Sequence, residues 1–312
     1  MENRSCITHF ILVAFSLTFT MRVVSFFFLL FIHIITLLGN FLIIFTIWKS
    51  NILHTAMYYF LVNLAFLEIC FTSSIIPKLL SILAFEYHAI TFWGCLTQCY
   101  FYFLLGSVEL LLLAAMSFDR YVAVCYPLRY GAVMTPRLCM LLTLGCWIAG
   151  FIDTLIPTLL VSKVWFCKSN VINHFFCDVE HLLKLACSKT GLIQFINLCS
   201  SSLVVFGSLI CIIVSYAYII VAVTKISRAE TSWKSFSTCA SHLLLVVIIY
   251  GSSLFLCMRG ITASYFDMSK LSAFMTGIVT PLLNPFIYTL KNTQDMPGVA
   301  CQINSCPDYT RV

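Results

Sequence analysis

Seven long apolar segments with very few charges dominate this chain of 312 residues. An α-helix rises about 1.5 Å per residue, so about 20 apolar residues cross the ~30 Å hydrocarbon layer of a membrane. The apolar runs are continuous, whereas the strands of a membrane barrel would alternate between apolar and polar residues. The sequence therefore predicts seven transmembrane helices, over Val23–Trp48, Met57–Leu80, Leu96–Ala123, Leu138–Leu160, Ile193–Thr224, Phe236–Met258 and Leu271–Leu290.

The composition excludes a soluble globular domain. Hydrophobic residues make up 61% of the chain and charged residues 10%, whereas soluble domains carry roughly 45–50% apolar and 25% charged residues. The net charge of +6 is scattered without a basic block, so no nucleic-acid partner is expected. We expect a single domain over residues 1–312, with an extracellular tail (1–22), a helix bundle (23–290) and a cytoplasmic tail (291–312).

Two features predict that the N-terminus lies outside the cell. Lys and Arg are divided almost equally between the two sides of the predicted bundle, so the positive-inside rule does not decide the orientation. Asn3 begins an N-glycosylation sequon, and this modification takes place in the lumen. Cys95, Cys167, Cys177 and Cys187 fall on the same side, where disulfides persist. Four cysteines allow three pairings, and the residues alone leave these open.

The third predicted span ends in Asp119-Arg120-Tyr121. From Cys95 to Arg120 a helix rises about 38 Å, so Arg120 lies at the opposite membrane interface from Cys95. Asp119 and Arg120 can form an ion pair there that leaves the guanidinium able to bind a second acceptor, as a two-state switch requires. The simpler interpretation of the motif is that its charged side chains extend to the membrane interface without acting as a switch.

The seventh predicted span contains Asn284-Pro285 and, one turn later, Tyr288. Pro285 removes one backbone hydrogen bond, and Asn284 can bind nearby polar groups. We therefore expect a kinked span that repacks between two arrangements. A tolerated proline kink is the alternative, but the motif shares its membrane face with Asp119-Arg120-Tyr121, which favours a switch.

Taken together, these segments resemble the odorant receptors, a branch of the rhodopsin-like (class A) G-protein-coupled receptors. The resemblance extends from Phe10-Ile11-Leu12 to Lys291-Asn292, and its signature runs are residues 53–61, 116–127, 234–242 and 281–288. It implies an all-α seven-transmembrane bundle with the N-terminus extracellular and the C-terminus cytoplasmic, in the plasma membrane of olfactory sensory cilia. It also implies an odorant receptor without a cofactor that activates the heterotrimeric olfactory stimulatory G protein and raises cyclic AMP.

The resemblance assigns roles to individual residues as well. It implies the disulfides Cys95–Cys177 and Cys167–Cys187. It gives Arg120 the contact with the G protein that forms when spans five and six part.

A small ligand is expected in the outer half of the bundle, where apolar walls carry a few polar groups. Span seven has no lysine between Leu271 and Leu290, so a retinal Schiff base is excluded. The outer half of span three has no aspartate, which favours a neutral, hydrophobic ligand such as a volatile alcohol, aldehyde, ester or ketone. We expect Asp153 to be satisfied by neighbouring helices rather than by a cationic ligand. The candidate residues that line this ligand region are Tyr102, Phe103, Gly106, Ser107, Glu180, Tyr250, Ser253, Leu254, Cys257, Phe274 and Gly277. The alternative for each of them is packing within the bundle, which is the commoner role of such side chains.

Glu68 and Glu109 lie at mid-membrane depth, where an unpaired carboxylate costs roughly 2–3 kcal/mol. We expect both to join a buried polar network with Asn40 and Asn284 that holds a sodium ion or a proton. A purely structural network is the alternative.

Two rival functions are less favoured. A membrane transporter or channel for a small solute is the alternative function, but the broken seventh span has no matching broken span in a second half. An enzyme is not expected, because no H-E-x-x-H, G-x-S-x-G or P-loop motif is present. A functional metal ion is not expected either, although a metal-like cluster is formed by His174, Cys177, Asp178, Glu180 and His181.

Overall fold

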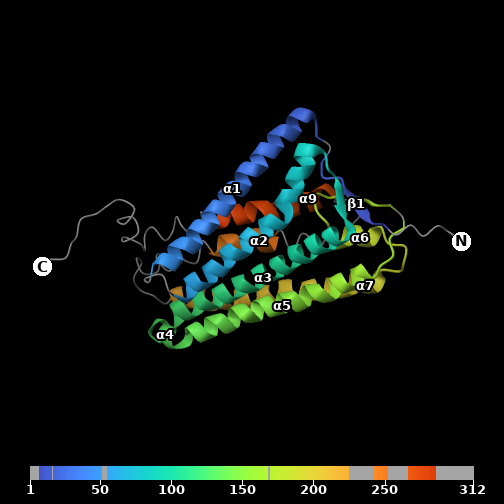
Figure 1. Cartoon of the computed structure of the whole chain (residues 1–312). Helices are drawn as coiled ribbons and strands as arrows, with labels where there is room; N and C mark the ends of the chain where they lie inside the picture. Colours follow the sequence, from blue (N-terminus) through green and yellow to red (C-terminus); the bar gives the residue numbers. More distant parts are fainter. Residues whose placement is uncertain are drawn as a thin grey trace.

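The computed structural model describes residues 7–15, 17–50, 55–167, 169–224, 242–251 and 266–285. Within these residues, five helices are long and apolar enough to cross a membrane: α1 (Phe19–Lys49), α2 (Ala56–Phe85), α3 (Phe92–Cys125), α5 (Pro136–Ser162) and α7 (Gly191–Thr224). They coincide with the first five predicted spans, and Figure 1 shows them running through the length of the bundle.

Several helices extend beyond their apolar runs by about one turn. α1 begins at Phe19 instead of Val23, and Thr18 caps it by accepting a hydrogen bond from the Met21 backbone N–H. Thr91 caps α3 in the same way. Such caps satisfy N–H groups that the first turn of a helix leaves without a partner. Helix ends at the membrane interface therefore do not require apolar residues.

The sixth and seventh predicted spans are described in part. An apolar helix, His242–Gly251, lies within the sixth. The seventh contains α9 (Phe266–Phe274), the π-helical segment η4 (Met275–Val279) and the helical residues 280–285. Single π-helical turns are rare and often occur at functional sites. The other residues of these two spans lie outside the described part of the chain.

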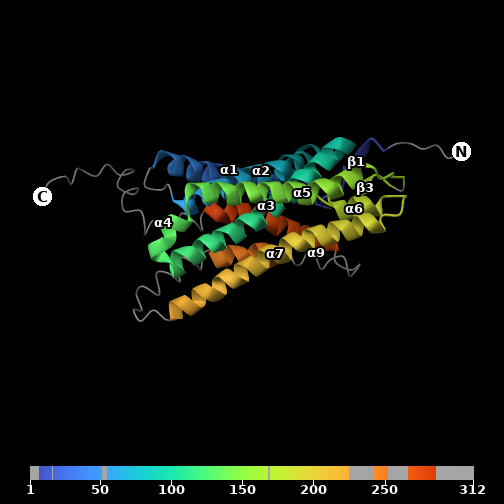
Figure 2. The same cartoon turned by 90° about the horizontal axis from the view of Figure 1, so that it is seen from below.

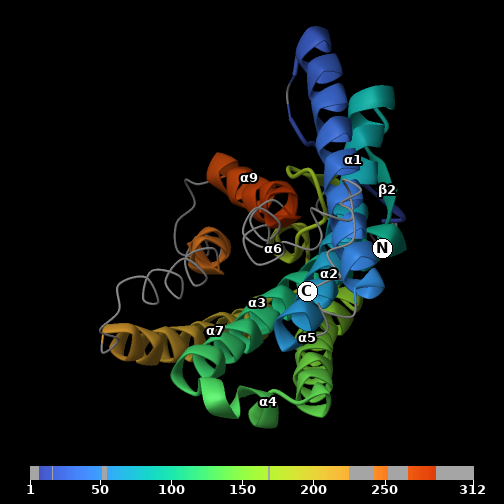
Figure 3. The same cartoon turned by 90° about the vertical axis from the view of Figure 1, so that its left-hand side faces the viewer.

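α3 lies at the centre of the bundle. It packs against α2, α5 and α7, while α1 packs on α2 at the periphery (Figures 1 and 3). Val108 and Leu112 of α3 are completely buried, whereas Phe27 and Phe31 of α1 are more than half exposed. Because apolar side chains on the outside of a membrane bundle face lipid, this distribution is the one expected of a membrane protein.

A small sheet covers one end of the bundle. β1 (His9–Leu12) is its central strand and pairs antiparallel with β2 (Ala89–Thr91) and parallel with β3 (Val171–Ile172). Phe10 and Leu12 alternate with exposed neighbours and are completely buried. The segment expected to be a partly apolar tail is therefore a strand with a buried face. The short helix α6 (Val179–Lys184) lies at this end, and α4 (Tyr130–Val133) lies at the other (Figures 1 and 2).

Candidate functional site

The Asp119–Arg120 pair forms at the α4 end of α3. Arg120 donates from Nη2 and Nε to Asp119 Oδ2, at 2.7 and 3.2 Å. The Asp119 side chain is almost completely buried. The other carboxylate oxygen, Oδ1, accepts a 2.7 Å hydrogen bond from the hydroxyl of Tyr130. Three donor atoms therefore hold one buried carboxylate, as a closed switch requires.

Tyr130 was not among the residues predicted from the sequence. After α3 ends, the 3-10 turn Pro127–Arg129 (η2) reverses the chain and places Tyr130 at the start of α4. Burial raises the pKa of the Tyr130 phenol, and the nearby Asp119 carboxylate raises that pKa further. The phenol therefore stays protonated at physiological pH and remains a donor to Asp119. The signal in the sequence was the helix-breaking Pro127, three residues before Tyr130.

Tyr121 is separate from the carboxylate that Arg120 binds. Its ring packs against Tyr218 of α7, with 5.6 Å between ring centroids, and its hydroxyl lies 3.5 Å from that of Tyr126. It thus joins α3 to α7 through aromatic contacts.

A second set of contacts joins α3 to α7 and to the sixth span. The Tyr216 hydroxyl of α7 lies 2.8 Å from Nδ1 of His242, whose Nε2 lies 3.2 Å from the backbone oxygen of Leu113 in α3. Tyr216 and His242 are both buried. In the sequence His242 is only the last residue of a signature run, and nothing there singles out Tyr216.

The seventh span is linked to α2 through Asn284. The Asn284 side-chain amide donates a hydrogen bond to Oε1 of Glu68. Asn40 of α1 also contacts Glu68, and Glu109 of α3 lies close enough to interact with it electrostatically. The four residues that were predicted to form one network do lie together and are buried. Within the described residues, Glu68 Oε2 and Glu109 Oε1 are buried without a hydrogen-bond partner.

Pro285 lies where the seventh span meets α1. A Cβ atom at Gly39 would lie 3.0 Å from Cβ of Pro285. The absence of a side chain at Gly39 therefore allows this close approach. Tyr288, the last residue of the predicted switch, lies outside the described residues.

The outer half of α3 supplies aromatic and small residues to the predicted ligand region. Tyr102 is buried, and its ring centroid lies 4.2 Å from that of Phe176 and 5.1 Å from that of Phe71. Its hydroxyl lies 3.5 Å from Oγ1 of Thr276 in η4. Phe103, Gly106 and Ser107 are half-buried on the same helix. Tyr102 thus connects α2, α3, η4 and the loop that carries Phe176.

Other predicted lining residues occupy different surroundings. The Tyr250 hydroxyl lies within hydrogen-bond distance of Ser208 Oγ, at 2.7 Å, and of the Leu110 backbone oxygen, at 3.3 Å, so it joins the sixth span to α7 and α3. Gly277 lies in η4, where an added Cβ would come within 3.1 Å of Ile75. Phe274, at the end of α9, is half-buried, as is Glu180 in α6. Ser253, Leu254 and Cys257 lie outside the described residues, as does the sequon residue Asn3.

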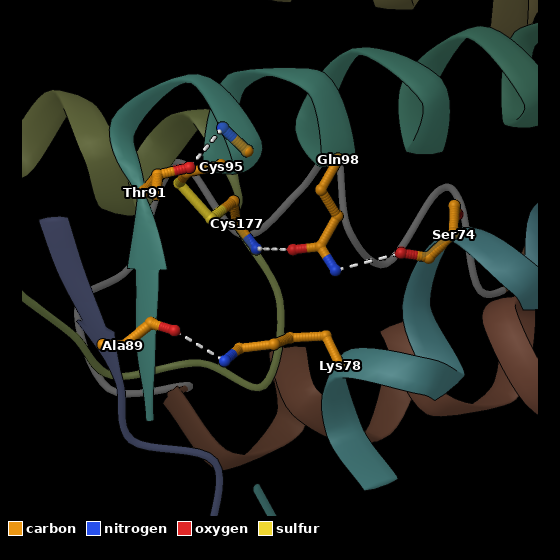
Figure 4. The surroundings of a disulfide bond; sticks show 8 residues. Ser74, Lys78, Ala89, Thr91, Cys95, Gln98 and Cys177 are labelled. Atoms are coloured by element: carbon orange, nitrogen blue, oxygen red, sulfur yellow. Dashed lines mark hydrogen bonds between the residues drawn. A yellow bond between two sulfur atoms is a disulfide. The ribbon is translucent and has the colours of Figure 1, made fainter. Parts of the chain in front are cut away.

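The loop between α5 and α7 is fastened to the end of the bundle. The structure joins Cys95 to Cys177 and Cys167 to Cys187, with Cα–Cα distances of 5.4 and 5.8 Å, which is the pairing that the resemblance implied. Gln98 bridges this loop and α2, accepting from the Cys177 N–H and donating to the Ser74 backbone oxygen (Figure 4).

Further contacts secure the same end of the bundle. Lys78 donates to the backbone oxygens of Tyr87 and Ala89. Lys270 of α9 binds the Ala14 backbone oxygen and the Asn173 side chain. In the part of the chain that the structure describes, no group of three or more His, Cys, Asp or Glu side chains is arranged to hold a metal ion.

The fold defines the class of protein. The chain resembles the crystal structure of squid rhodopsin with a TM-score of 0.67 and 16% sequence identity, over 95% of this chain and 90% of that one. It therefore has the helix-bundle fold of rhodopsin.

The sequence comparisons define the family. The olfactory receptor family model matches residues 29–303. The chain is 45% identical to olfactory receptor 6J1 of Homo sapiens, over 92% of this chain and 83% of that one, and 44% identical to olfactory receptor 287 of Rattus norvegicus, over 93% and 94%. It is 41% identical to olfactory receptor 6X1 of Homo sapiens over 98% of both chains. The chain belongs to the olfactory receptor family.

Membership of the olfactory receptor family establishes the general function of the chain. The chain is a G-protein-coupled receptor for small molecules, a multi-pass protein of the plasma membrane, and not an enzyme.

Proposed function

We propose that this receptor binds small, hydrophobic, neutral volatile compounds in the outer half of its bundle and activates the olfactory stimulatory G protein. Its N-terminus then lies outside the cell and its C-terminus inside, with residues 1–312 forming one receptor domain in the ciliary membrane. The single observation that carries the proposal is the geometry of α3. It joins the aromatic cluster around Tyr102 to the buried Asp119–Arg120 pair, 18 residues and about 27 Å of helix apart.

The outer half of α3 supports a neutral, apolar ligand. Tyr102 and its ring partners offer aromatic surface, and Ser107 offers a polar group. Pockets for small ligands combine apolar walls with a few polar groups in this way. The outer part of α3 has no acidic residue before Glu109, which itself is buried.

The extracellular position of the N-terminus is supported by the disulfides. β1 lies in one sheet with β3, and β3 belongs to the loop that carries both disulfides. Disulfides form and persist in the extracellular compartment. The N-terminal strand and the ligand region therefore belong to the outer face, where we also place a glycan on Asn3.

The opposite end supports coupling to a G protein. Asp119 and Arg120 lie next to the turn η2 and α4, and the Tyr216–His242 contact joins the spans that must part to admit a G protein. A pair of this kind can exchange its partner when those spans separate. The coupling to a stimulatory G protein rests on the family resemblance.

The test is a cyclic AMP reporter in cells that express the full chain. We expect at least one neutral alcohol, aldehyde, ester or ketone to raise cyclic AMP in a dose-dependent manner. Arg120→Ala removes the response at equal surface expression, whereas Arg137→Ala, at an exposed position on α5, leaves it intact. A response that survives Arg120→Ala contradicts the proposed switch. Solute flux into liposomes containing the purified chain, without any G-protein activation, favours a transporter instead.

We also propose that the network of Asn40, Glu68, Glu109 and Asn284 holds a sodium ion or a proton. Two carboxylates buried side by side repel each other unless a cation or proton lies between them. The buried oxygens of Glu68 and Glu109 that have no partner among the described residues are the atoms available for it.

A further inference from the structure

Three helices contribute to a polar cluster in the membrane interior. Ser107 of α3 donates a 2.8 Å hydrogen bond from Oγ to Oδ2 of Asp153 in α5. The side chain of Ser200 in α7 lies close enough to interact with the same carboxyl group, and its hydroxyl donates to the Asn197 backbone oxygen at 3.3 Å. The three helices pack against one another. We call these three residues the Asp153 cluster.

The cluster lies at the depth of the proposed ligand region. Ser107 precedes Arg120 by 13 residues, which places it about 20 Å of helical rise toward the outer end. Phe103 and Gly106 flank Ser107 on the outer side, and all three are only half-buried. Asp153 is half-buried as well. The carboxyl group is therefore next to the residues that we propose contact the ligand.

The hydroxyl partners do not saturate Asp153. A carboxylate is an acceptor with about four lone-pair positions, and a serine hydroxyl supplies one proton. Within the described residues, none of the ion pairs includes Asp153. A carboxylate at membrane depth is costly unless donors surround it. The Asp153 cluster thus has capacity for a further donor.

A second polar atom lies along the same face of α3. Tyr100 precedes Ser107 by seven residues, so both side chains point to one side of the helix. The Tyr100 ring packs edge-on against Phe151, two residues before Asp153. Its hydroxyl is buried without a hydrogen-bond partner among the described residues. The junction of α3 and α5 therefore contains two polar groups that a small polar molecule can satisfy.

We infer that Asp153 accepts a hydrogen bond from the ligand, and that the receptor consequently prefers compounds with a hydroxyl group to carbonyl compounds and ethers of the same shape. A hydroxyl satisfies the carboxylate. An aldehyde, ketone or ether oxygen can only accept, so it leaves the carboxylate unsatisfied and faces another acceptor. The inference rests on the proposed function, because that function places the ligand beside Ser107.

The experiment compares ligands that differ in one group. Straight-chain primary alcohols, aldehydes, methyl ethers and primary amines of several matched lengths are tested with the cyclic AMP reporter. We expect each activating alcohol to be more potent than its matched aldehyde and ether by about tenfold or more, as for a hydrogen bond to a charged group. Surface expression is measured for every variant.

Three variants distinguish recognition of the ligand by Asp153 from a structural role of this residue. Asp153→Asn keeps the shape of the side chain but adds a donor, so the alcohol-to-aldehyde potency ratio falls toward one. Ser107→Ala removes one internal donor from Asp153, so the carboxylate has more capacity for a ligand hydroxyl and the alcohol-to-aldehyde potency ratio rises. Ser162→Ala is the control. Ser162 lies on the same helix as Asp153, and its hydroxyl donates to the Leu159 backbone oxygen, so the substitution changes neither the potency of the ligands nor the alcohol-to-aldehyde ratio. If the role of Asp153 is purely structural, Asp153→Asn lowers the responses to all ligands in proportion and leaves the alcohol-to-aldehyde potency ratio unchanged.

The outcomes distinguish this inference from the proposed function. Equal potency of matched alcohols and aldehydes, unaffected by Asp153→Asn, overturns the inference and leaves the proposed receptor function standing. Activation by amines alone, abolished in Asp153→Asn, supports the contact with Asp153 and overturns the neutral ligand class. If the panel and every other volatile compound fail to raise cyclic AMP in the wild type at normal surface expression, both proposals fail.

Discussion

The hydroxyl of Tyr130 donates a 2.7 Å hydrogen bond to Asp119 Oδ1, while Arg120 binds Oδ2 of the same carboxylate. Tyr130 belongs to α4, outside the membrane-spanning helices, so this bond ties the connection between α3 and α5 to the switch. Any movement that separates Asp119 from Arg120 must also accommodate Tyr130.

Replacing Tyr130 with phenylalanine should raise basal signalling. The substitution removes one donor from a buried carboxylate that holds Arg120, and a hydrogen bond to a charged group contributes about 1.5–3 kcal/mol. Because the closed arrangement loses this contribution, we expect ligand-independent cyclic AMP to rise by at least about threefold. The measurement is basal reporter output normalised to surface expression.

Tyr59→Phe is the matched control for this substitution. Tyr59 is 40% exposed on α2, and among the described residues the side-chain donors to Asp119 are Arg120 and Tyr130, so the Tyr59 hydroxyl has no part in the proposed switch. Equal basal output from Tyr130→Phe, Tyr59→Phe and the wild type would refute the role given to Tyr130.

Replacing Asn284 with alanine should destabilise the receptor. The Asn284 side chain is buried and donates to Glu68, so its removal leaves a buried carboxylate with one donor fewer. The expected loss is about 1–3 kcal/mol of unfolding free energy, seen as a lower Tm of the detergent-solubilised receptor. Asn63→Ala is the control, because Asn63 of α2 is only half-buried and the hydrogen bond of its side chain among the described residues is to the Tyr59 backbone oxygen. Equal Tm values for the two variants would count against the network.

A sodium ion in the network should make the ligand response depend on sodium. We expect replacement of sodium chloride by choline chloride to change ligand potency by about fivefold or more, the usual scale of coupling between two sites. Glu109→Gln removes one carboxylate and should abolish the dependence. If the potency is the same in both salts, the network holds no sodium, and a proton or a purely structural role remains.

The sequence was sufficient to predict the five long membrane-spanning helices among the described residues. Continuous apolar runs located the described spans, because only a helix satisfies its own backbone in lipid. The helix ends were less predictable, since capping residues such as Thr18 continue a helix past its apolar run. The adjacency of Asp119 and Arg120 in the sequence made their ion pair predictable.

Contacts between distant segments were harder to predict. The helices are apolar on most sides, so the sequence does not fix how each is rotated, and the partners of Asp153 and Tyr216 depend on that rotation. Pairing of β1 with β2 and β3 depends on where two loops lie in space, which the local sequence of His9–Leu12 does not specify. Tyr130 was missed for a similar reason, because its contact with Asp119 depends on the turn at Pro127.

Two glycines of α5 provide a test of the central packing. A Cβ atom at Gly150 would lie 2.7 Å from Val108 Cγ2 and 3.4 Å from the Leu104 backbone oxygen, whereas a Cβ atom at Gly145 would meet nothing within 4 Å. Gly150→Leu should therefore push α5 away from α3 and cost about 1–3 kcal/mol of stability. Gly145→Leu, on a part of the helix with open space around it, should cost no more than about 0.5 kcal/mol. The measurements are Tm in detergent and the fraction of receptor at the cell surface. Equal effects of the two substitutions would mean that α3 and α5 do not approach each other at Gly150, and the Ser107–Asp153 hydrogen bond, which depends on the same approach, would then be in question.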